Sequence, residues 1–227
     1  MKKLSLLTVA LSAGALFGQS SSTGEARVQI FGDFVRASDQ VIAQIGSVGV
    51  TDQAKAQTGF GIRFIGELPG TSNWFYQLGG RLASTSKFET NGTVAPGIRV
   101  DATDVKFGYS YWSIGGGYHW NFGDFTLGTH LEGRGEALSA KGYLYVTGGT
   151  GSGPVDHSVT YLRPWVRLSG DWSFKAGSVQ PFIGLDASLA ITKTSQNSVL
   201  GLTVLDDRNL KAMAPNASFG LYVGLKF

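Results

Sequence analysis

The last nine residues, FGLYVGLKF, constrain the fold more than any other segment. Phe219, Leu221, Val223, Leu225 and Phe227 alternate with Gly220, Tyr222, Gly224 and Lys226. Successive side chains of a β-strand point to opposite faces, so this segment is predicted to be a strand with one apolar and one mixed face. A strand at the end of a chain leaves a free edge. The fold must therefore supply a partner for that edge.

Seven further segments show the same period of two, which indicates an all-β fold. They cover residues 26–35, 58–68, 73–83, 111–122, 125–137, 160–172 and 179–191. The connections at 69–73, 121–124 and 173–178 are short, whereas those at 38–57, 84–104, 138–158 and 193–213 are long and polar. Such alternation predicts an eight-stranded antiparallel up-and-down transmembrane β-barrel, with short periplasmic turns and long extracellular loops. Residues 41–50 and 141–148 could extend strands above the membrane or add a hairpin. An added hairpin would give ten strands, so ten strands is an alternative to eight.

The face opposite the apolar one carries balanced charge. It contains six arginines and six carboxylates, together with histidines: Arg27, Asp33, Arg63, Glu67, Arg81, His119, His130, Glu132, Arg134, Glu136, Arg163, Arg167, Asp171 and Asp186. Charges sealed in a narrow interior need partners, whereas a solvated face needs no such balance. Arginine also pairs two carboxylates at once and keeps its proton. We therefore expect the charges to line the lumen and the apolar face to meet lipid.

Aromatic residues support the same orientation. Trp74, Trp120, Phe125, Trp172 and Phe227 lie on the apolar face near a short turn or the C-terminus, as expected for a periplasmic aromatic belt. A second, looser belt near the long loops would use Phe34, Phe60, Tyr109 and Trp112. Because open sheet edges do not occur in hydrocarbon, the last strand is expected to close on the first.

The N-terminus has the layout of a secretory signal peptide. Residues 1–20 contain Lys2, Lys3, an apolar run and small residues at 13–15. We expect cleavage at about residues 15–20, then a short segment at 21–25 and the barrel domain at 26–227. Removing the two lysines from 19 basic residues leaves 17 against 16 acidic ones, so the charge gives no argument for nucleic acid. The chain has no cysteine and therefore no disulfide.

With these features the chain resembles the small eight-stranded outer-membrane barrels, the superfamily that includes the OmpA transmembrane domain and the OmpX and OmpW types. The terminal SFGLYVGLKF is similar to the insertion signal that the barrel-assembly machinery reads, carried here by Phe219, Leu221, Val223, Leu225 and Phe227. The segment QPFIGLDASLA is similar to the penultimate strand of such domains. The resemblance implies a bacterial outer-membrane location, with membrane lipid and lipopolysaccharide as surroundings, and it says much less about activity.

The strongest candidate for chemistry is the series His130, Glu132, Arg134 and Glu136, spaced by two residues on one face. An acid–base or metal site is conceivable, but a salt-bridge ladder with Arg63, Arg81, Arg163 and Arg167 is the better interpretation, since metal sites usually collect more histidines. We expect no cofactor, no metal and no catalytic residue.

An eight-stranded barrel is just wide enough for side chains to fill its interior. The leading hypothesis is therefore a monomeric structural or surface-interaction barrel, whose long loops meet a ligand that the sequence does not identify. The alternatives are a narrow channel or small-solute transporter, as the OmpW type suggests by resemblance, and a lipid-modifying enzyme.

Overall fold

The structure is a computed structural model that describes residues 25–38, 40–45, 48–52, 55–71, 73–88, 91–149, 152–174, 178–192 and 207–227. Its elements are β1 (Ala26–Val35), β2 (Gln40–Ile45), β3 (Val48–Asp52), β4 (Gln57–Glu67), β5 (Trp74–Lys87), β6 (Asn91–Ala95), β7 (Ile98–Asp101), β8 (Lys106–Phe122), β9 (Phe125–Thr147), β10 (Gly153–Ser173), β11 (Gln180–Ala190), α2 (Asp207–Ala212) and β12 (Ala217–Lys226). The expected signal peptide lies outside the described residues. No helix in the described ranges is long and apolar enough to span a membrane.

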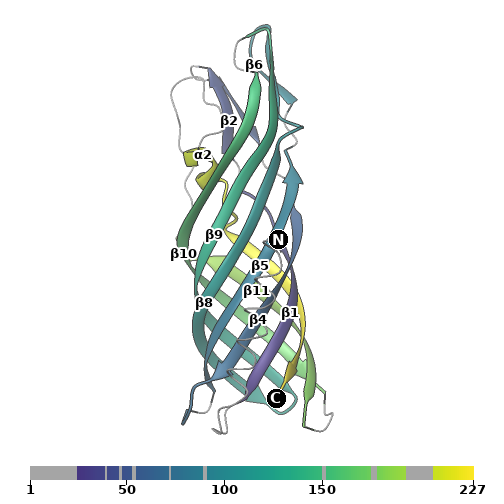
Figure 1. The fold of residues 1–227 in the computed structure, drawn as a ribbon, viewed down its shortest axis with the longest axis vertical. Coiled ribbons are helices and arrows are strands. Elements are labelled where there is room, and N and C mark those ends of the chain that lie inside the picture. Colours follow the sequence, from purple (N-terminus) through teal and green to yellow (C-terminus); the bar gives the residue numbers. More distant parts are fainter. Residues whose placement is uncertain are drawn as a thin grey trace, which may run out of the picture.

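Eight strands form a closed antiparallel barrel (Figure 1). Their order is β1-β4-β5-β8-β9-β10-β11-β12, and β12 pairs with β1 from Arg27 opposite Lys226 to Val35 opposite Ser218. The amide of Phe227 donates to the carbonyl of Ala26 at 2.9 Å, so pairing continues to the last residue. The predicted fold class and the closure of the last strand on the first are confirmed. β2 and β3 pair only with each other as a separate two-stranded sheet, so the ten-strand alternative is wrong.

The connections at one end of the barrel are short (Figure 1). β8 and β9 are joined through Gly123 and Asp124, and Gly123 has a positive φ of 67° that suits glycine. The C-terminus lies at this end (Figure 1). At the opposite end β9 and β10 rise well above the other strands (Figure 1).

The expected loop at 138–158 is therefore wrong for most of its length. β9 continues to Thr147 and β10 starts at Gly153, with paired residues up to Leu144 opposite Gly153. The side chains of this stretch keep the period of two, because Leu138, Ala140 and Leu144 are buried and their neighbours are more exposed. The interval expected as a loop at 84–104 also contains the β6–β7 hairpin, and β7 adds to β9 from Arg99 opposite Thr147.

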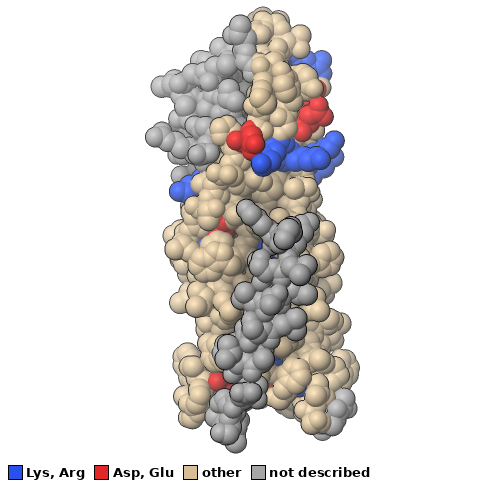
Figure 2. All heavy atoms as spheres, viewed as in Figure 1, with Lys and Arg blue, Asp and Glu red and all other residues tan. Residues whose placement is uncertain are grey.

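The two faces of the wall differ as the sequence predicts. Ile30, Leu78 and Val223 are 59%, 39% and 52% exposed on the outside, whereas Arg81 and Glu132 are 3% and 1% exposed inside. On the face seen in Figure 2, the described part of the wall is almost free of charged atoms over most of its height. Apolar side chains outside and ionised ones inside suit a barrel surrounded by acyl chains.

A β-bulge in β5 changes which of its residues face outward. Arg81 is opposite Tyr111 and Ser84 is opposite Tyr109, so β5 holds one extra residue between these pairs. Below the bulge the even-numbered Leu78 and Leu82 are exposed, and above it the odd-numbered Lys87 is exposed. Bulges of this kind re-aim side chains.

The neighbouring strand β8 shows no such change, which corrects one expectation. Tyr109 and Tyr111 both point inward and are buried, whereas Trp112 is 51% exposed. Tyr109 therefore does not belong to the aromatic belt near the long connections. Phe34, Phe60 and Trp112 do face outward.

An apolar core fills the interior at the tall end of the barrel. Inward residues of β8, β9 and β10, among them Phe107, Leu138 and Val155, pack in one cluster with Leu210, Met213 and Ala214 from α2 and the residues after it. α2 contacts β9 and β10 and lies near the tall end (Figure 1). The interior is therefore charged towards the short turns and apolar towards the long connections.

The orientation predicts a depth-dependent penalty for charge on the outer wall. Leu185, in the middle of β11 and opposite Leu221 of β12, is 49% exposed. Leu185→Arg should lower the free energy of unfolding in lipid by about 2–4 kcal/mol, because a guanidinium would lie at mid-depth in hydrocarbon. The matched variant Leu68→Arg, just after β4 at the short-turn end, should cost about 0–1 kcal/mol. Urea unfolding in bilayers measures both values, and equal penalties would contradict the orientation.

Candidate functional site: the filled interior of the barrel

The charges nearest the short turns form a cluster around Asp171 of β10. Lys226 Nζ lies 3.2 Å from Asp171 Oδ1, and Arg27 Nη1 lies 3.5 Å from Asp171 Oδ2. Arg27 also pairs with Glu25, just before β1. These contacts join the two strands that close the barrel, β1 and β12, to β10 across the interior. Closure of the wall and filling of the interior thus use the same residues.

Above this cluster lies a layer of rings and amides. The ring of Phe75 stacks on His119 with centroids 4.0 Å apart, and it lies 4.7 Å from the ring of His130. His130 Nε2 is 2.8 Å from Ser169 Oγ, and its Nδ1 is 2.7 Å from Arg167 Nη2 and 3.0 Å from Gln77 Oε1. Both ring nitrogens of His130 are therefore engaged within the interior.

A network of arginines and carboxylates occupies the middle of the interior. Glu132 accepts hydrogen bonds from Arg167 Nε at 2.5 Å and from Arg134 Nε at 2.9 Å, so it bridges two guanidinium groups. Asp186 accepts from Arg63 Nη1 at 2.5 Å, and Arg167 Nη1 lies 3.8 Å from the same carboxylate. All five side chains are buried and come from β4, β9, β10 and β11. Side chains from four strands thus contact one another inside the barrel.

Two further pairs lie next to the apolar core. Arg81 Nε donates to Asp33 Oδ1 at 2.6 Å, and Arg81 Nη1 donates to the Tyr109 carbonyl at 2.6 Å. Arg163 Nε donates to Glu136 Oε2 at 2.7 Å, and the Tyr109 hydroxyl donates to Glu136 Oε1 at 2.6 Å. Each buried carboxylate therefore has a guanidinium partner, as burial requires.

Aromatic side chains fill the space between these charges. The Arg134 guanidinium carbon lies 4.2 Å from the ring of Trp165 and 4.5 Å from the ring of Tyr111. The Arg63 guanidinium carbon lies 3.8 Å from the ring of Phe31. Such cation–π contacts stabilise a guanidinium and exclude water from its faces. They also occupy the cross-section of the interior.

The structure places the predicted lumen residues as follows. Twelve are buried inside: Arg27, Asp33, Arg63, Arg81, His130, Glu132, Arg134, Glu136, Arg163, Arg167, Asp171 and Asp186. Glu67 is half-buried at the short-turn end, where its Oε2 accepts from the amide of Glu25. Counting Lys226 and Glu25 with them gives seven basic and seven acidic side chains. Lys226 could have been found from its position on the mixed face of the last strand.

The predicted aromatic belt lies at the short-turn end. Trp74, Trp120, Trp172 and Phe227 are exposed on the outer wall, and Phe125 is half-buried with its ring centroid 6.3 Å from that of Trp172. Phe122 and Phe174, next to two of the short turns, are exposed as well. The belt therefore contains more residues than the sequence predicted.

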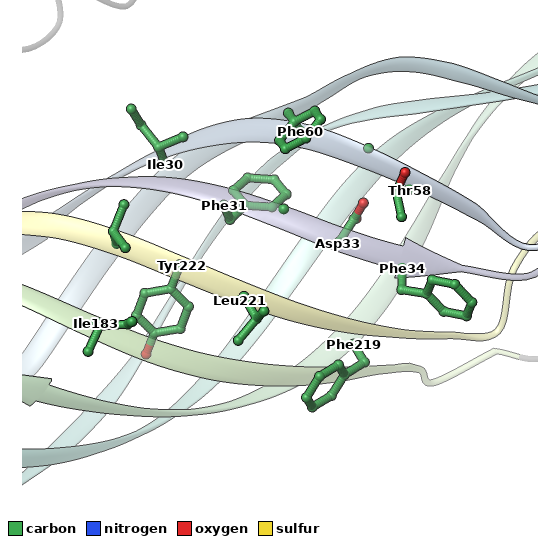
Figure 3. Close-up of a pocket in the computed structure, with 13 residues that line it drawn as sticks. Ile30, Phe31, Asp33, Phe34, Thr58, Phe60, Ile183, Phe219, Leu221 and Tyr222 are labelled. Carbon is green, nitrogen blue, oxygen red and sulfur yellow. The ribbon is translucent and has the colours of Figure 1, made fainter.

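The outer wall contains an apolar groove over the closing seam (Figure 3). It has a volume of about 610 Å³. Gly32 is one of the residues that line it, and its neighbours across the sheet are Phe60 of β4 and Leu221 of β12. Since Gly32 has no side chain, these neighbours flank a depression in the wall.

The interior offers no metal site among the described residues, because they contain no group of three or more metal-ligating side chains in reach of one ion. The rings of His119 and His130 are neighbours, with centroids 5.7 Å apart. The ring of Phe75 packs against both of them. His157 is far from them in sequence, on β10 near its start.

Comparison with known proteins finds no matching family model and no matching curated protein. Solved structures do match over most of the chain. Neisserial surface protein A is 12% identical with a TM-score of 0.43, covering 88% of this chain and 95% of its own. Ail, the attachment invasion locus protein of Yersinia pestis, is 12% identical with a TM-score of 0.45, covering 90% and 99%. Outer membrane protein AlkL is 10% identical with a TM-score of 0.41, covering 92% and 91%.

The identities and TM-scores are low, so these similarities do not indicate a function. The strand pairing itself establishes the fold. This protein is a small eight-stranded β-barrel of the outer-membrane type. Its apolar exterior and charged interior are those of a barrel that spans a membrane.

The network predicts a large penalty for an unpaired interior carboxylate. Arg163→Met should lower the free energy of unfolding by about 3–5 kcal/mol, because Glu136 would lose its guanidinium partner in a buried site. The double variant Arg163→Met with Glu136→Gln should recover part of this loss. Lys141→Gln is the matched control, since Lys141 pairs with Asp156 at 2.9 Å on the exposed surface, and it should cost about 0–1 kcal/mol. Urea unfolding in lipid compares the variants, and a neutral Arg163→Met would indicate a hydrated interior.

Proposed function

We propose that this protein is a structural or surface-interaction barrel of the bacterial outer membrane, with an interior that transmits no solute. The single observation that carries the proposal is how completely the middle of the interior is filled. Arg63, Arg134, Arg167 and Trp165 are among the largest fully buried side chains in the described part of the chain. Each belongs to the network of ion pairs and cation–π contacts described above. A solute would have to break several of these contacts to pass.

The apolar core at the tall end supports the same proposal. Above the last ion pairs, the interior is packed with Phe107, Leu138 and Val155, and Met213 and Ala214 lie in the same cluster. Water and ions have no polar groups to follow through such a packed apolar region. Two different kinds of filling therefore lie in series along the axis of the barrel.

A narrow channel or small-solute transporter remains the alternative function. It would need movement of both the arginine network and the apolar core, since neither leaves a path by itself. An apolar solute could enter the core more easily than an ion, but it would then meet Arg81 and Asp33. The balance of the contacts favours the filled interior.

A lipid-modifying enzyme is the third function and the least supported one. Such an enzyme needs a nucleophile or base with an orienting partner on a surface that lipid can reach. His119 and His130 are buried inside the barrel, away from lipid. We therefore keep the prediction that the protein has no catalytic residue and binds no cofactor.

The remaining elements of the proposal concern partners. The outward residues of β12, from Phe219 to Phe227, are proposed as the signal that the barrel-assembly machinery reads during insertion. The protein is proposed to act as a monomer, with no nucleic-acid partner, and the tall end formed by β6, β7, β9 and β10 is proposed as the part that meets an extracellular ligand. This region has the paired backbone needed for a stable binding surface.

The proposal predicts an electrically silent protein. Purified protein in planar bilayers should give no steady, reproducible single-channel openings, because the network and the core block the axis in series. A large porin reconstituted in the same bilayers is the positive control. Reproducible openings of the wild-type protein would contradict the filled interior and favour the channel.

A further inference from the structure

In the described part of the chain, the interior above the Asp171 cluster contains five buried arginines and four buried carboxylates. Four ion pairs can be assigned one to one: Arg63 with Asp186, Arg81 with Asp33, Arg163 with Glu136 and Arg167 with Glu132. Arg134 is the fifth arginine. Its carboxylate partner is Glu132, which also pairs with Arg167. Arg134 is therefore the surplus cation of this region.

The charges at the short-turn end do not balance the surplus. Two pairs there compensate each other: Arg27 with Glu25 and Lys226 with Asp171. Glu67 is a further acid at that end, but it is only half-buried. It lies four residues from Arg63 along β4, which is about 13 Å at a rise of about 3.3 Å per residue. The surplus cation in the middle of the interior therefore needs a counter-charge of its own.

Donor groups without an acceptor gather around Arg134. Its Nη1 has no hydrogen-bond partner among the described residues, and neither do the hydroxyls of Tyr111 and Ser113 and the indole nitrogen of Trp165. Ser113 of β8 is directly opposite Arg134 of β9. The Arg134 guanidinium carbon lies against the rings of Tyr111 and Trp165, at 4.5 Å and 4.2 Å. Three neighbouring strands thus bring four buried donors to one place.

The nearby carboxylates do not supply the missing acceptors. Both oxygens of Glu132 and both oxygens of Glu136 already accept hydrogen bonds from arginines. Asp33 Oδ2 has no hydrogen-bond partner among the described residues, but one oxygen is too few for four donors on three strands. Donors without a partner therefore outnumber acceptors around the surplus cation.

Charge distinguishes the two kinds of ligand that could meet these donors. A water molecule could accept hydrogen bonds, but it would leave a positive charge uncompensated in a buried site, where an unpaired ion is costly. Arginine keeps its proton in proteins, so titration cannot remove the charge. A small monovalent anion accepts from several donors at once and neutralises one positive charge. Such an anion fits both the donors and the charge.

We infer that the interior binds one small monovalent anion of the halide class, such as chloride, between the Arg134 guanidinium and the donors of Tyr111, Ser113 and Trp165. Its size is limited because side chains fill an interior of this width. The donor atoms are shut off from solvent, so the ion enters as the barrel folds or when the side chains around it move. The site goes beyond the proposed function, because it gives the filled interior a ligand of its own.

The test compares two variants that each remove one buried cation from the full barrel. Arg134→Met removes the surplus cation and leaves all four one-to-one ion pairs in place. Lys226→Met is the matched control, because it lies outside the proposed site and Asp171 keeps Arg27 within 3.5 Å. Each protein is refolded in detergent in sodium chloride, sodium bromide or sodium gluconate at equal ionic strength. Heat-dependent gel mobility verifies that each variant is folded.

The unfolding temperature of the wild type should be higher in either halide than in gluconate. The expected difference is about 3–6 °C at a halide concentration tenfold above the dissociation constant, because an ion that binds only the folded state stabilises it. Lys226→Met should keep this difference, and Arg134→Met should lose it. Equal unfolding temperatures of the wild type in halide and gluconate would overturn the inference. A difference in Arg134→Met as large as in the wild type would overturn it too.

A milder variant keeps the inference testable if Arg134→Met does not fold. Trp165→Phe removes one donor and retains an aromatic ring beside Arg134. It should weaken halide binding about tenfold, as expected for the loss of one hydrogen bond to a charged group. The concentration of halide that stabilises the fold measures this change. Undiminished halide binding by Trp165→Phe would remove its indole from the site and contradict the inference.

The Trp165 indole also reports the ion directly. The chain has five tryptophans, and the other four are exposed on the outer wall: Trp74, Trp112, Trp120 and Trp172. Exchange of chloride for bromide should move the indole nitrogen–proton NMR signal that Trp165→Phe lacks, and it should leave the other four in place. An unmoved Trp165 signal would contradict the inference. Channel openings by wild type with these halide effects intact would defeat only the proposed function and leave this site in place.

Discussion

The need to pair every backbone amide in hydrocarbon governs this structure. No water is available in the core of a membrane to satisfy an open sheet edge, so the wall must close. Here the closure joins the two ends of the barrel domain, β1 and β12, along nine residue pairs. Once the wall is closed with eight strands, its interior has a width that side chains can span. The charge network, the ring contacts and the apolar core are all consequences of that width.

Closure also explains why the interior can hold so much charge. A buried ion pair contributes little net stability when compared with apolar packing, but a carboxylate that loses its partner is costly. Arg63 of β4 with Asp186 of β11 links strands that are not neighbours in the sheet, so the ionic contacts define which wall positions face each other. In the apolar core, side-chain packing defines which wall positions face each other. Ion pairs in the middle and apolar packing at the tall end together fill the interior.

The sequence predicted the wall better than its upper connections, for a physical reason. Lipid outside and charge inside impose a period of two with a sharp contrast, as at Leu127, His130 and Glu132 on β9, and that contrast is visible in any single strand. Above the membrane the outward face no longer meets lipid and can be polar, so residues 138–158 were expected as a long connection, with strand extension at 141–148 as an alternative; that alternative is correct, because β9 continues to Thr147. The bulge in β5 was invisible because Leu82 and Ala83 are both apolar. Pairings within the interior, such as Arg63 with Asp186, join residues far apart in sequence. They could not be predicted without the geometry of the closed barrel.

That bulge makes β5 a strand of two phases. Below Leu82 its alternation suits contact with acyl chains, and above Ala83 it suits aqueous surroundings. One inserted residue lets both halves satisfy their own solvent while keeping their partner on β8. The strand therefore meets a different medium on its outer side above the bulge than below it, while its pairing with β8 runs through both halves.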